Sequence, residues 1–337
     1  MGPALTIVIT NHNYAEFVAQ AVDSALAQRG VSPEVIVVDD GSTDESRRVI
    51  EGFGSRVHTV FTANDGQAAA MNRGFAESHG DVVIFLDADD ELFQDTGRRV
   101  TEAVAADPSI VRVQFVLDVI DRFGRPTGET VPSAPKRLFA GDARPRLLTC
   151  PDDIVWQPTS GNAFTRTGLG AVLPIPEAEF RLCADFFLSN LVPLHGIVHS
   201  LEGSGGGYRV HGGNAFYSGA ETPVRLRTNI WRTNETHRCL IAESRRLGLS
   251  GLPSDPAAVR SVSSAANRLL SYRLDPRQHP ITADSRVGLV RLGLSSSAAR
   301  TDVSPLRRLA FASWFLAMAI VPRRLVSVVA RPFARLE

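Results

Sequence analysis

Three aspartates follow one short apolar segment of this chain. Val82–Leu86 contains only Val, Ile, Phe and Leu, which is typical of a strand buried on both faces inside a parallel sheet. Asp87, Asp89 and Asp90 come directly after it, with Ala88 as a spacer. Carboxylates this close repel one another, and their pKa values rise unless a cation lies among them. Mg²⁺ or Mn²⁺ suits such a cluster, because both prefer oxygen ligands and complete their coordination with substrate phosphates. A solvated acidic turn that caps the next helix is the alternative interpretation.

Strands and helices alternate in the segments that lead to this cluster. Buried-type strands are predicted at 5–10, 34–39, 57–61 and 82–86, and helices at 17–27, 46–53 and 68–78. This alternation predicts a mostly parallel sheet with helices on both faces. The polar segments that follow or adjoin strand ends are 11–14, 39–43, 64–67 and 87–90. We expect them to line one crevice at the carboxyl edge of the sheet.

Composition limits the class of protein. The 337 residues suffice for one large domain or for a core domain with an appendage, and 44% are hydrophobic. The formal net charge is zero, which does not favour binding to nucleic acid. Cys150, Cys183 and Cys239 are too widely spaced for a zinc site and too few for a disulfide framework. Because the predicted first strand leaves no room for a signal peptide, we expect a cytoplasmic protein.

Four blocks of this sequence resemble, in order and spacing, the N-terminal half of family 2 glycosyltransferases with the GT-A fold. They are VITNHNYAEFVAQAVDSALAQ, VIVVDDGSTDES, NDGQAAAMNRGF and GDVVIFLDADDEL. The segments 158–164, 183–187 and 208–211 resemble the acceptor side of such enzymes. The resemblance covers about residues 4–216 and implies an α/β GT-A fold, a Rossmann-like and mostly parallel sheet flanked by helices. It also implies transfer of a hexosyl group, with inversion, from a nucleotide-diphosphate sugar to a hydroxyl of a glycan or lipid-linked acceptor.

The resemblance assigns a donor site. Its residues are Thr10, His12, Asp39, Asp40, Asp65, Gln67, Asp87, Ala88, Arg209 and His211. A carboxylate at Asp39 or Asp40 is suited to accept a hydrogen bond from the imide N–H of the base, and the family pattern favours Asp40. His12 stands where the family often places an aromatic ring against the base. As alternatives, Asp40 caps the following helix and His12 is a solvated loop residue. A UDP-sugar is the expected donor.

The same resemblance makes Asp89 the direct ligand of Mn²⁺ or Mg²⁺, with Asp87 holding the metal or the ribose. His211 is a further candidate ligand, and a purely structural histidine is the alternative. The ion would stabilise the charge that develops on the departing diphosphate. The glycine-rich run 203–214 lacks the Gly-Lys-Ser/Thr ending of a phosphate-binding loop. It predicts a flexible segment that closes over the donor and brings Arg209 and His211 to the diphosphate.

Asp185 is the candidate general base. Inversion requires one carboxylate opposite the leaving group, to take the proton of the attacking hydroxyl. Asp185 lies among apolar residues, where partial desolvation raises the pKa of a carboxyl group. The family often has a glutamate before this aspartate, whereas this chain has Ala184. An N-cap of a helix at 186–194 is the alternative role. The acceptor pocket is predicted to include Trp156, Ser160 and Gly161.

The sequence predicts two domains. Residues 1–220 form the glycosyltransferase domain, with a nucleotide-binding half at about 1–110 and an acceptor half at about 111–220. Residues 221–337 form a helical region, with helices at 223–247 and 257–274, and with Ser254 or Asp255 as a cap of the second helix.

Near the C-terminus, Leu309–Val321 is an apolar run with arginine pairs before and after it. At ~1.5 Å per residue it extends about 20 Å, too short for a hydrocarbon core of about 30 Å. We therefore predict a membrane-surface helix at 306–331, peripheral at the inner face of the cell membrane, with arginines on anionic headgroups. A helix that completes the core, or one that forms a dimer seam, is the alternative. The sequence predicts no oligomeric state.

Other functions fit the sequence less well. A nucleotidyltransferase would need a glycine-rich basic loop after the first strand, and residues 11–14 contain neither glycine nor lysine. A haloacid-dehalogenase-type phosphatase would need Asp-x-Thr after its nucleophile, and residues 87–91 lack the threonine. The non-enzyme alternative is an inactive sugar-nucleotide-binding scaffold at the membrane.

Overall fold

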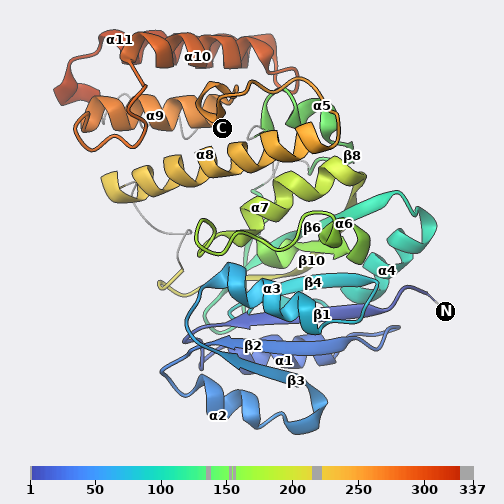
Figure 1. The fold of residues 1–337 in the computed structure, drawn as a ribbon. Coiled ribbons are helices and arrows are strands. Elements are labelled where there is room, and N and C mark those ends of the chain that lie inside the picture. Colours follow the sequence, from blue (N-terminus) through green and yellow to red (C-terminus); the bar gives the residue numbers. More distant parts are fainter. Residues whose placement is uncertain (1, 134–137, 152–153, 155–156, 215–221, 327–337) are drawn as a thin grey trace. The chain divides into compact units, whose positions relative to one another are not determined.

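The computed structural model describes residues 2–133, 138–151, 154, 157–214 and 222–326 (Figure 1). The chain divides into two compact units, one formed by residues 1–143 and 155–218, the other by residues 144–154 and 219–337. The segment 144–154 therefore belongs with the C-terminal helices, an association that no sequence pattern predicted.

The first unit is built on a sheet that has ten strands among the described residues. They are β1 (Leu5–Asn11), β2 (Glu34–Asp40), β3 (His58–Thr62), β4 (Val82–Asp87), β5 (Glu91–Leu92), β6 (Ile110–Asp121), β7 (Pro126–Val131), β8 (Gly141–Asp142), β9 (Asn162–Thr165) and β10 (Ile197–Val210). The order is β3-β2-β1-β4-β9-β6-β10-β5, with β7 on β6 and β8 on β10. Strands β1 to β4 are mutually parallel, whereas β9 runs antiparallel to β4 and β6. The predicted parallel N-terminal sheet is confirmed.

Helices cover both faces of this sheet. They are α1 (Val18–Leu26), α2 (Ser46–Glu51), α3 (Gln67–Glu77), α4 (Thr96–Ala106), α6 (Arg166–Gly170) and α7 (Ala184–Leu191), with short 3₁₀ turns at Gly54–Arg56, Thr159–Gly161 and Val192–His195. Alternate strand residues face opposite sides. Ile7 and Val37 pack in the cluster that includes α1. Val8 and Val38 approach Gly74 of α3, where a Cβ would lie only 2.2 Å from Val8.

The glycine-rich run at 203–214 was predicted to be flexible, and this prediction is wrong for its first part. Residues up to Val210 belong to β10, which pairs along its length with β6. A Cβ on Gly205 would lie 2.4 Å from the Phe115 ring, and one on Gly206 would lie 2.4 Å from the Glu91 carbonyl. These glycines therefore allow close packing inside the sheet rather than mobility.

The second unit contains α5 (Arg144–Leu147), α8 (Pro223–Arg246), α9 (Val262–Leu274), α10 (Arg286–Ala299) and α11 (Pro305–Ile320), with 3₁₀ turns at Pro256–Ala258 and Arg323–Leu325. Helices α9, α10 and α11 share one core. Helix α9 begins later than predicted, because Ser261 caps it, while Asp255 caps the short turn before it. Among the described residues, no helix combines the length and apolarity needed to cross a membrane.

Candidate active site

The polar loops meet at the carboxyl edge of the parallel strands, as predicted. Strand register places Asn11 of β1 beside Asp39 of β2 and Thr10 beside Asp87 of β4. The Ala88 amide donates a hydrogen bond to the Thr10 carbonyl (3.2 Å), which continues this pairing beyond the end of β4. The first and fourth blocks of the sequence are therefore in direct contact.

Asp39 and Asp40 each hold a loop of this edge in place. The Asp39 carboxylate accepts a hydrogen bond from the Ser42 amide (2.9 Å). The Asp40 carboxylate accepts hydrogen bonds from the amides of Asp65 (2.8 Å) and Gly66 (2.7 Å), at the start of α3. Helix α2, which follows Asp40, has Glu45 as its N-cap, so the alternative role of Asp40 as a cap of that helix is wrong. Recognition of a base by either carboxylate stays a prediction.

His12 is fixed by three hydrogen bonds. Its Nδ1 lies 2.7 Å from the carbonyl of Asp40, which can only accept, so Nδ1 carries the proton. In the neutral ring, Nε2 then accepts from the side-chain amides of Asn13 (3.1 Å) and Asn64 (3.2 Å). The ring is thus an ordered part of the edge rather than a freely solvated loop residue.

The acidic cluster has the electrostatic properties expected from its sequence. Burial, followed by the charges of Asp89 and Asp185, raises the pKa of Asp87 to about 7. Burial, followed by the charges of Asp89 and Asp87, raises the pKa of Asp90 well above its ordinary value. A cation bound among these side chains would relieve both effects.

His211 lies beside this cluster. Its Nε2 is 3.0 Å from Asp89 Oδ2, and its backbone amide donates to Asn214 Oδ1 (2.8 Å). Arg209 is fully buried, and its Nε donates to the Asp89 carbonyl (2.7 Å) while its Nη2 pairs with Glu91 (3.2 Å). The structure therefore gives Arg209 a bracing role beneath the cluster, and its predicted contact with a diphosphate stays a prediction.

Gln67 connects the cluster with the start of α7. Its Nε2 donates to Asp87 Oδ1 (3.2 Å) and to Thr159 Oγ1 (3.3 Å), while its Oε1 accepts from the Ala184 amide (3.1 Å). One side chain thus links three elements, and we predicted it only as a donor contact.

Asp185 lies in the first turn of α7. The N-cap of this helix is Cys183, in a left-handed conformation (φ 63°), so the alternative role of Asp185 as N-cap is wrong. Asp185 Oδ1 accepts from the Phe186 amide (2.9 Å). Gln67 bridges Asp87 and the Ala184 amide, which places Asp185 near the acidic cluster, and the charge of Asp185 contributes to the raised pKa of Asp87.

Ser160, in the 3₁₀ turn Thr159–Gly161, braces the acidic loop. Its hydroxyl donates to Asp90 Oδ2 (2.6 Å) and accepts from the Asp87 amide (3.1 Å). Gly161 is buried next to it, with no room for a Cβ against the side chain of Gln157 (2.9 Å). Trp156 lies outside the described residues. Contact of Ser160 and Gly161 with an acceptor stays a prediction.

The side-chain oxygen and nitrogen atoms of the acidic cluster and His211 are suitable ligands for a divalent metal ion. Asp89 and His211 offer one oxygen and one nitrogen 3.0 Å apart, and the neighbouring carboxylates add negative charge. Within the described ranges, no three His, Cys, Asp or Glu side chains are arranged to hold a metal ion by themselves. A Mn²⁺ or Mg²⁺ ion at this position would therefore share its coordination with substrate oxygens.

Comparison with known proteins identifies the family. The family model described as glycosyl transferase family 2 matches residues 6–158. An uncharacterized glycosyltransferase of Nostoc sp. (strain PCC 7120), alr2836, is 34% identical over 239 residues, which are 68% of this chain and 73% of that protein. This chain belongs to glycosyltransferase family 2. The succinoglycan biosynthesis protein ExoO of Rhizobium meliloti is 35% identical over 125 residues, and the match covers 36% of each protein.

Solved structures place the glycosyltransferase in the predicted fold. S. aureus TarS 1–349, solved with UDP-GlcNAc, superposes with a TM-score of 0.58 at 13% identity, over 98% of this chain and 92% of that one. The mannosyltransferase PcManGT of Pyrobaculum calidifontis, solved with GDP-Man and Mn²⁺, gives 0.52 at 15% identity, over 100% of this chain and 86% of that one. At these identities the likeness shows the fold alone, and the predicted GT-A fold is confirmed.

Arg112 is a site residue that the sequence analysis missed. It is fully buried in β6, and burial lowers the pKa of its guanidinium to about 9 while the charge of Asp185 opposes that shift. Its Nε and Nη2 donate to Asn162 Oδ1 (3.0 and 2.5 Å), and its Nη1 donates to the Ser189 carbonyl of α7 (3.2 Å). The glycosyltransferase thus places a buried cation near its candidate base. In the sequence, the only indication of a special role for Arg112 is that a charged residue stands in a mostly apolar strand.

Aromatic side chains close the other side of the acidic cluster. Burial, followed by the charges of the three aspartates, raises the pKa of the Tyr14 hydroxyl, which therefore stays protonated as a donor. The His211 ring packs against Tyr14 (centroids 5.6 Å apart) and Phe17 (4.7 Å). Tyr14 belongs to the first of the four blocks, VITNHNYAEFVAQAVDSALAQ, but nothing in the sequence singled out one aromatic residue in a loop.

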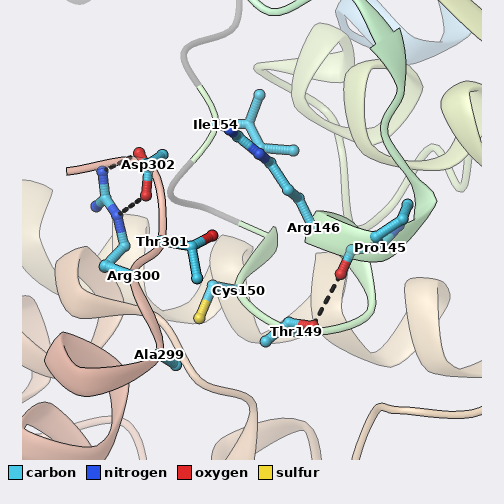
Figure 2. Close-up of a pocket in the computed structure, with 9 residues that line it drawn as sticks. All are labelled: Pro145, Arg146, Thr149, Cys150, Ile154, Ala299, Arg300, Thr301 and Asp302. Atoms are coloured by element: carbon cyan, nitrogen blue, oxygen red, sulfur yellow. Dashed lines mark hydrogen bonds and ion pairs between the residues drawn. The ribbon is translucent and has the colours of Figure 1, made fainter.

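A separate cavity of about 260 Å³ lies in the second unit (Figure 2). Figure 2 shows Arg300 paired with Asp302 (2.7 Å) on one side and Arg146 on another. Burial acts to raise the pKa of Asp302, but its hydrogen bonds and charge interaction with Arg300 hold that pKa below its ordinary value. Because no predicted site residue lines it, this cavity is not the candidate active site.

Proposed function

We propose that this glycosyltransferase transfers a hexosyl group, with inversion, from a nucleotide-diphosphate sugar to a hydroxyl of a glycan or lipid-linked acceptor. The observation that carries the proposal is the Gln67 bridge: its side chain donates to Asp87 Oδ1 at the end of the parallel strand β4 (3.2 Å) and accepts from the Ala184 amide (3.1 Å), next to Asp185 in the first turn of α7. A UDP-sugar is the preferred donor candidate, and the binding of UDP-GlcNAc by TarS supports it. ExoO is described as a succinoglycan biosynthesis protein, and this similarity supports a role in bacterial surface polysaccharide assembly.

In this proposal Asp185 is the general base. Its carboxylate accepts the proton of the acceptor hydroxyl while the hydroxyl oxygen forms a bond to the anomeric carbon and the diphosphate leaves from the opposite face. Arg112 is a positioning residue, since it ties α7 through the Ser189 carbonyl and offsets the negative charge at Asp185. Gln67 sets the distance between this base and the acidic cluster.

The donor end uses the acidic cluster. Asp89 and His211, assisted by Asp87, would hold Mn²⁺ or Mg²⁺, and the PcManGT structure with Mn²⁺ supports this choice. When bound, the ion would supply positive charge that stabilises the departing diphosphate. His12, Asp39 and Asp40 would contact the nucleoside, and the Tyr14 hydroxyl would donate a hydrogen bond to a phosphate oxygen.

We extend the proposal to the place of action. The enzyme would work peripherally at the cytoplasmic face of the cell membrane, where a lipid-linked acceptor is presented. The apolar run 309–321, with arginine pairs on either side, supports this placement.

The test combines binding and turnover. Thermal shift with UDP and GDP, with and without Mn²⁺, selects the donor class, since a bound ligand raises the Tm. The release of nucleoside diphosphate is then measured for the parent chain, for Asp185→Asn and for Asp23→Asn, an exposed aspartate of α1. We expect Asp185→Asn to keep Mn²⁺-dependent donor binding and to lose turnover by about 10³-fold, as removal of a general base predicts. The Asp23→Asn control should match the parent.

An inactive scaffold gives a different result. Such a protein binds the nucleotide but shows no turnover in the parent or in either variant. Full turnover by Asp185→Asn would assign the base to another residue.

A further inference from the structure

Helix α11 is apolar on two opposite faces. Its inner face packs Phe311, Phe315 and Met318 into the core shared with α9 and α10, where all three are fully buried. Figure 1 shows α10 and α11 side by side in this unit. A surface helix needs only this one apolar face to fold against its neighbours. The apolar residues on the other face therefore require a separate explanation.

The outer face carries four large apolar side chains, Leu306, Leu309, Leu316 and Ile320, which we call the outer stripe. Their exposed fractions are 77%, 63%, 53% and 85%. At ~100° per residue these four positions fall within an arc of roughly 80°, so they form one continuous band along the helix. Exposed apolar bands of this kind mark surfaces that bind another molecule or a membrane.

The charges around the outer stripe favour a negatively charged partner. Arg307 and Arg308 lie at the start of α11, and Arg323 and Arg324 follow its end. No aspartate or glutamate occurs between Val303 and Leu336. If a second copy packed on this band, its own band would bring no acidic side chain to the arginines, because this segment contains none. At ~100° per residue, Arg307 and Arg308 lie roughly 120–140° from the centre of the band, and Arg307 packs over the Phe311 ring of the inner face. Anionic lipid headgroups would instead meet Arg323 and Arg324, which are exposed just beyond the end of the helix.

We propose that the outer stripe docks this enzyme onto a bilayer that contains anionic lipids, with α11 lying in the plane of the interface. The 16 residues of α11 extend about 24 Å, and the band runs along this whole length, which matches a helix lying on a membrane rather than across it. The four apolar side chains enter the boundary between headgroups and acyl chains, and Arg323 and Arg324 contact the phosphates. The inference deepens the proposed membrane location, but its test does not depend on sugar transfer.

The experiment is vesicle co-sedimentation of the full chain with phosphatidylcholine vesicles and with vesicles containing 30% phosphatidylglycerol. We expect binding to the anionic vesicles that weakens as salt is raised. The double variant Leu309→Glu/Leu316→Glu should weaken this binding more than tenfold, because both side chains are exposed and their replacement leaves the core intact. Arg323→Gln/Arg324→Gln should weaken it about tenfold, since each arginine near the surface contributes about fivefold at most.

Val224→Glu is the matched control, because Val224 is 64% exposed on α8 and lies outside the outer stripe. It should bind like the parent. Thermal melting and Mn²⁺-dependent nucleotide binding, measured on every variant, show that each one is folded and keep this test separate from the proposed activity. The proposal is overturned by absence of vesicle binding, by equal binding to neutral vesicles, or by full binding of Leu309→Glu/Leu316→Glu. A dimer interface is the competing outcome. The proposal is also overturned if the parent does not bind vesicles but is a dimer by light scattering, and Leu309→Glu/Leu316→Glu is a monomer.

Discussion

Buried aspartates in the two units lie in opposite electrostatic surroundings. In the second unit, Asp284 accepts hydrogen bonds from Arg268 Nε (2.9 Å) and from His279 Nε2 (2.8 Å). These hydrogen bonds and the two neighbouring charges hold the pKa of Asp284 below its ordinary value, although burial opposes them. In the first unit, burial and mutual repulsion raise the pKa values of Asp87 and Asp90.

The difference separates a structural ion pair from a prepared binding site. Asp284 is neutralised within the protein, so the protein gains stability from it and needs nothing further. Asp87 and Asp90 are held by hydroxyl, amide and backbone N–H donors, which orient a carboxylate without neutralising its charge. The buried Arg209 nearby pairs with Glu91 instead. Buried carboxyl groups whose pKa values are raised in this way are typical of functional sites, and a bound cation would favour their ionised form.

The largest predicted contrast is between Asp89→Ala and Asp284→Asn. Asp89→Ala should weaken Mn²⁺-dependent nucleotide binding by at least about 100-fold, equivalent to ~2.7 kcal/mol, because it removes the proposed direct ligand of the metal. Asp284→Asn should leave that binding unchanged but lower the free energy of unfolding by about 3–5 kcal/mol, since Arg268 then keeps a buried charge without its counterion. Calorimetric titration measures the first effect and urea unfolding the second. If both variants lost only stability, the proposed distinction between the two clusters would be wrong.

The second contrast concerns two buried arginines. Arg112→Met should lower kcat by about 10- to 100-fold with little change in donor KM, because the proposal has Arg112 position the base, Asp185, rather than the donor. Arg268→Met, an equally buried change in the second unit, should reduce stability and leave kcat unchanged. Steady-state kinetics on both variants gives the comparison.

Arg112→Lys distinguishes a charge effect from simple packing. A lysine keeps the positive charge near Asp185 but loses the forked contact with Asn162. We therefore expect it to recover part of the lost kcat. A lysine variant no better than the methionine variant would reduce Arg112 to a structural role.

Much of the donor half could be predicted from the sequence, because its signals are local. Apolar runs of strand length gave β1 to β4, and the polar residues after them had to meet, since parallel strands place their carboxyl ends on one edge. The raised pKa of Asp87 followed from residue types and spacing alone.

The remaining site depends on contacts between distant segments. Arg112 is near Asp185 only because β6 runs beneath α7, and Ser160 reaches Asp90 only because a turn packs across β4. The many glycines before Val210 predicted a flexible segment. In the structure they lie in a strand, and the absence of a Cβ lets Gly205 and Gly206 pack closely against Phe115 and Glu91. Whether a residue must be small or charged at these positions depends on a contact residue far away in the sequence. The neighbouring sequence therefore carries no pattern that predicts it.

A smaller contrast appears in the pH dependence of stability. The folded-state pKa of Asp87, about 7, exceeds its ordinary value of 3.8, so the folded chain binds more protons than the unfolded chain between these values. Without metal, Asp87 should therefore destabilise the fold increasingly as pH rises from 4 to 7. Asp87→Asn removes this penalty and should raise the Tm at pH 8 by roughly 2–5 °C, with a gain that shrinks towards pH 4. Thermal melts of both chains in a chelator, from pH 4 to pH 8, test the direction of this pH dependence. A gain in Tm from Asp87→Asn that is larger at pH 4 than at pH 8 would contradict the prediction.

The smallest contrast compares how two helices begin. Cys183 precedes α7 in a left-handed conformation that disfavours a side chain, whereas Ser261 precedes α9 in an extended conformation and its hydroxyl accepts from the Ser264 amide (3.0 Å). Cys183→Gly should therefore stabilise the chain by about 0.5–1 kcal/mol, while Ser261→Ala should destabilise it by about 1 kcal/mol through loss of the cap. Urea unfolding measures both changes.

Because the left-handed residue stands two positions before Asp185, Cys183→Gly should also lower kcat more than it changes donor KM, since a glycine there holds the base less firmly. An unchanged kcat would show that the strain at Cys183 has no part in placing Asp185.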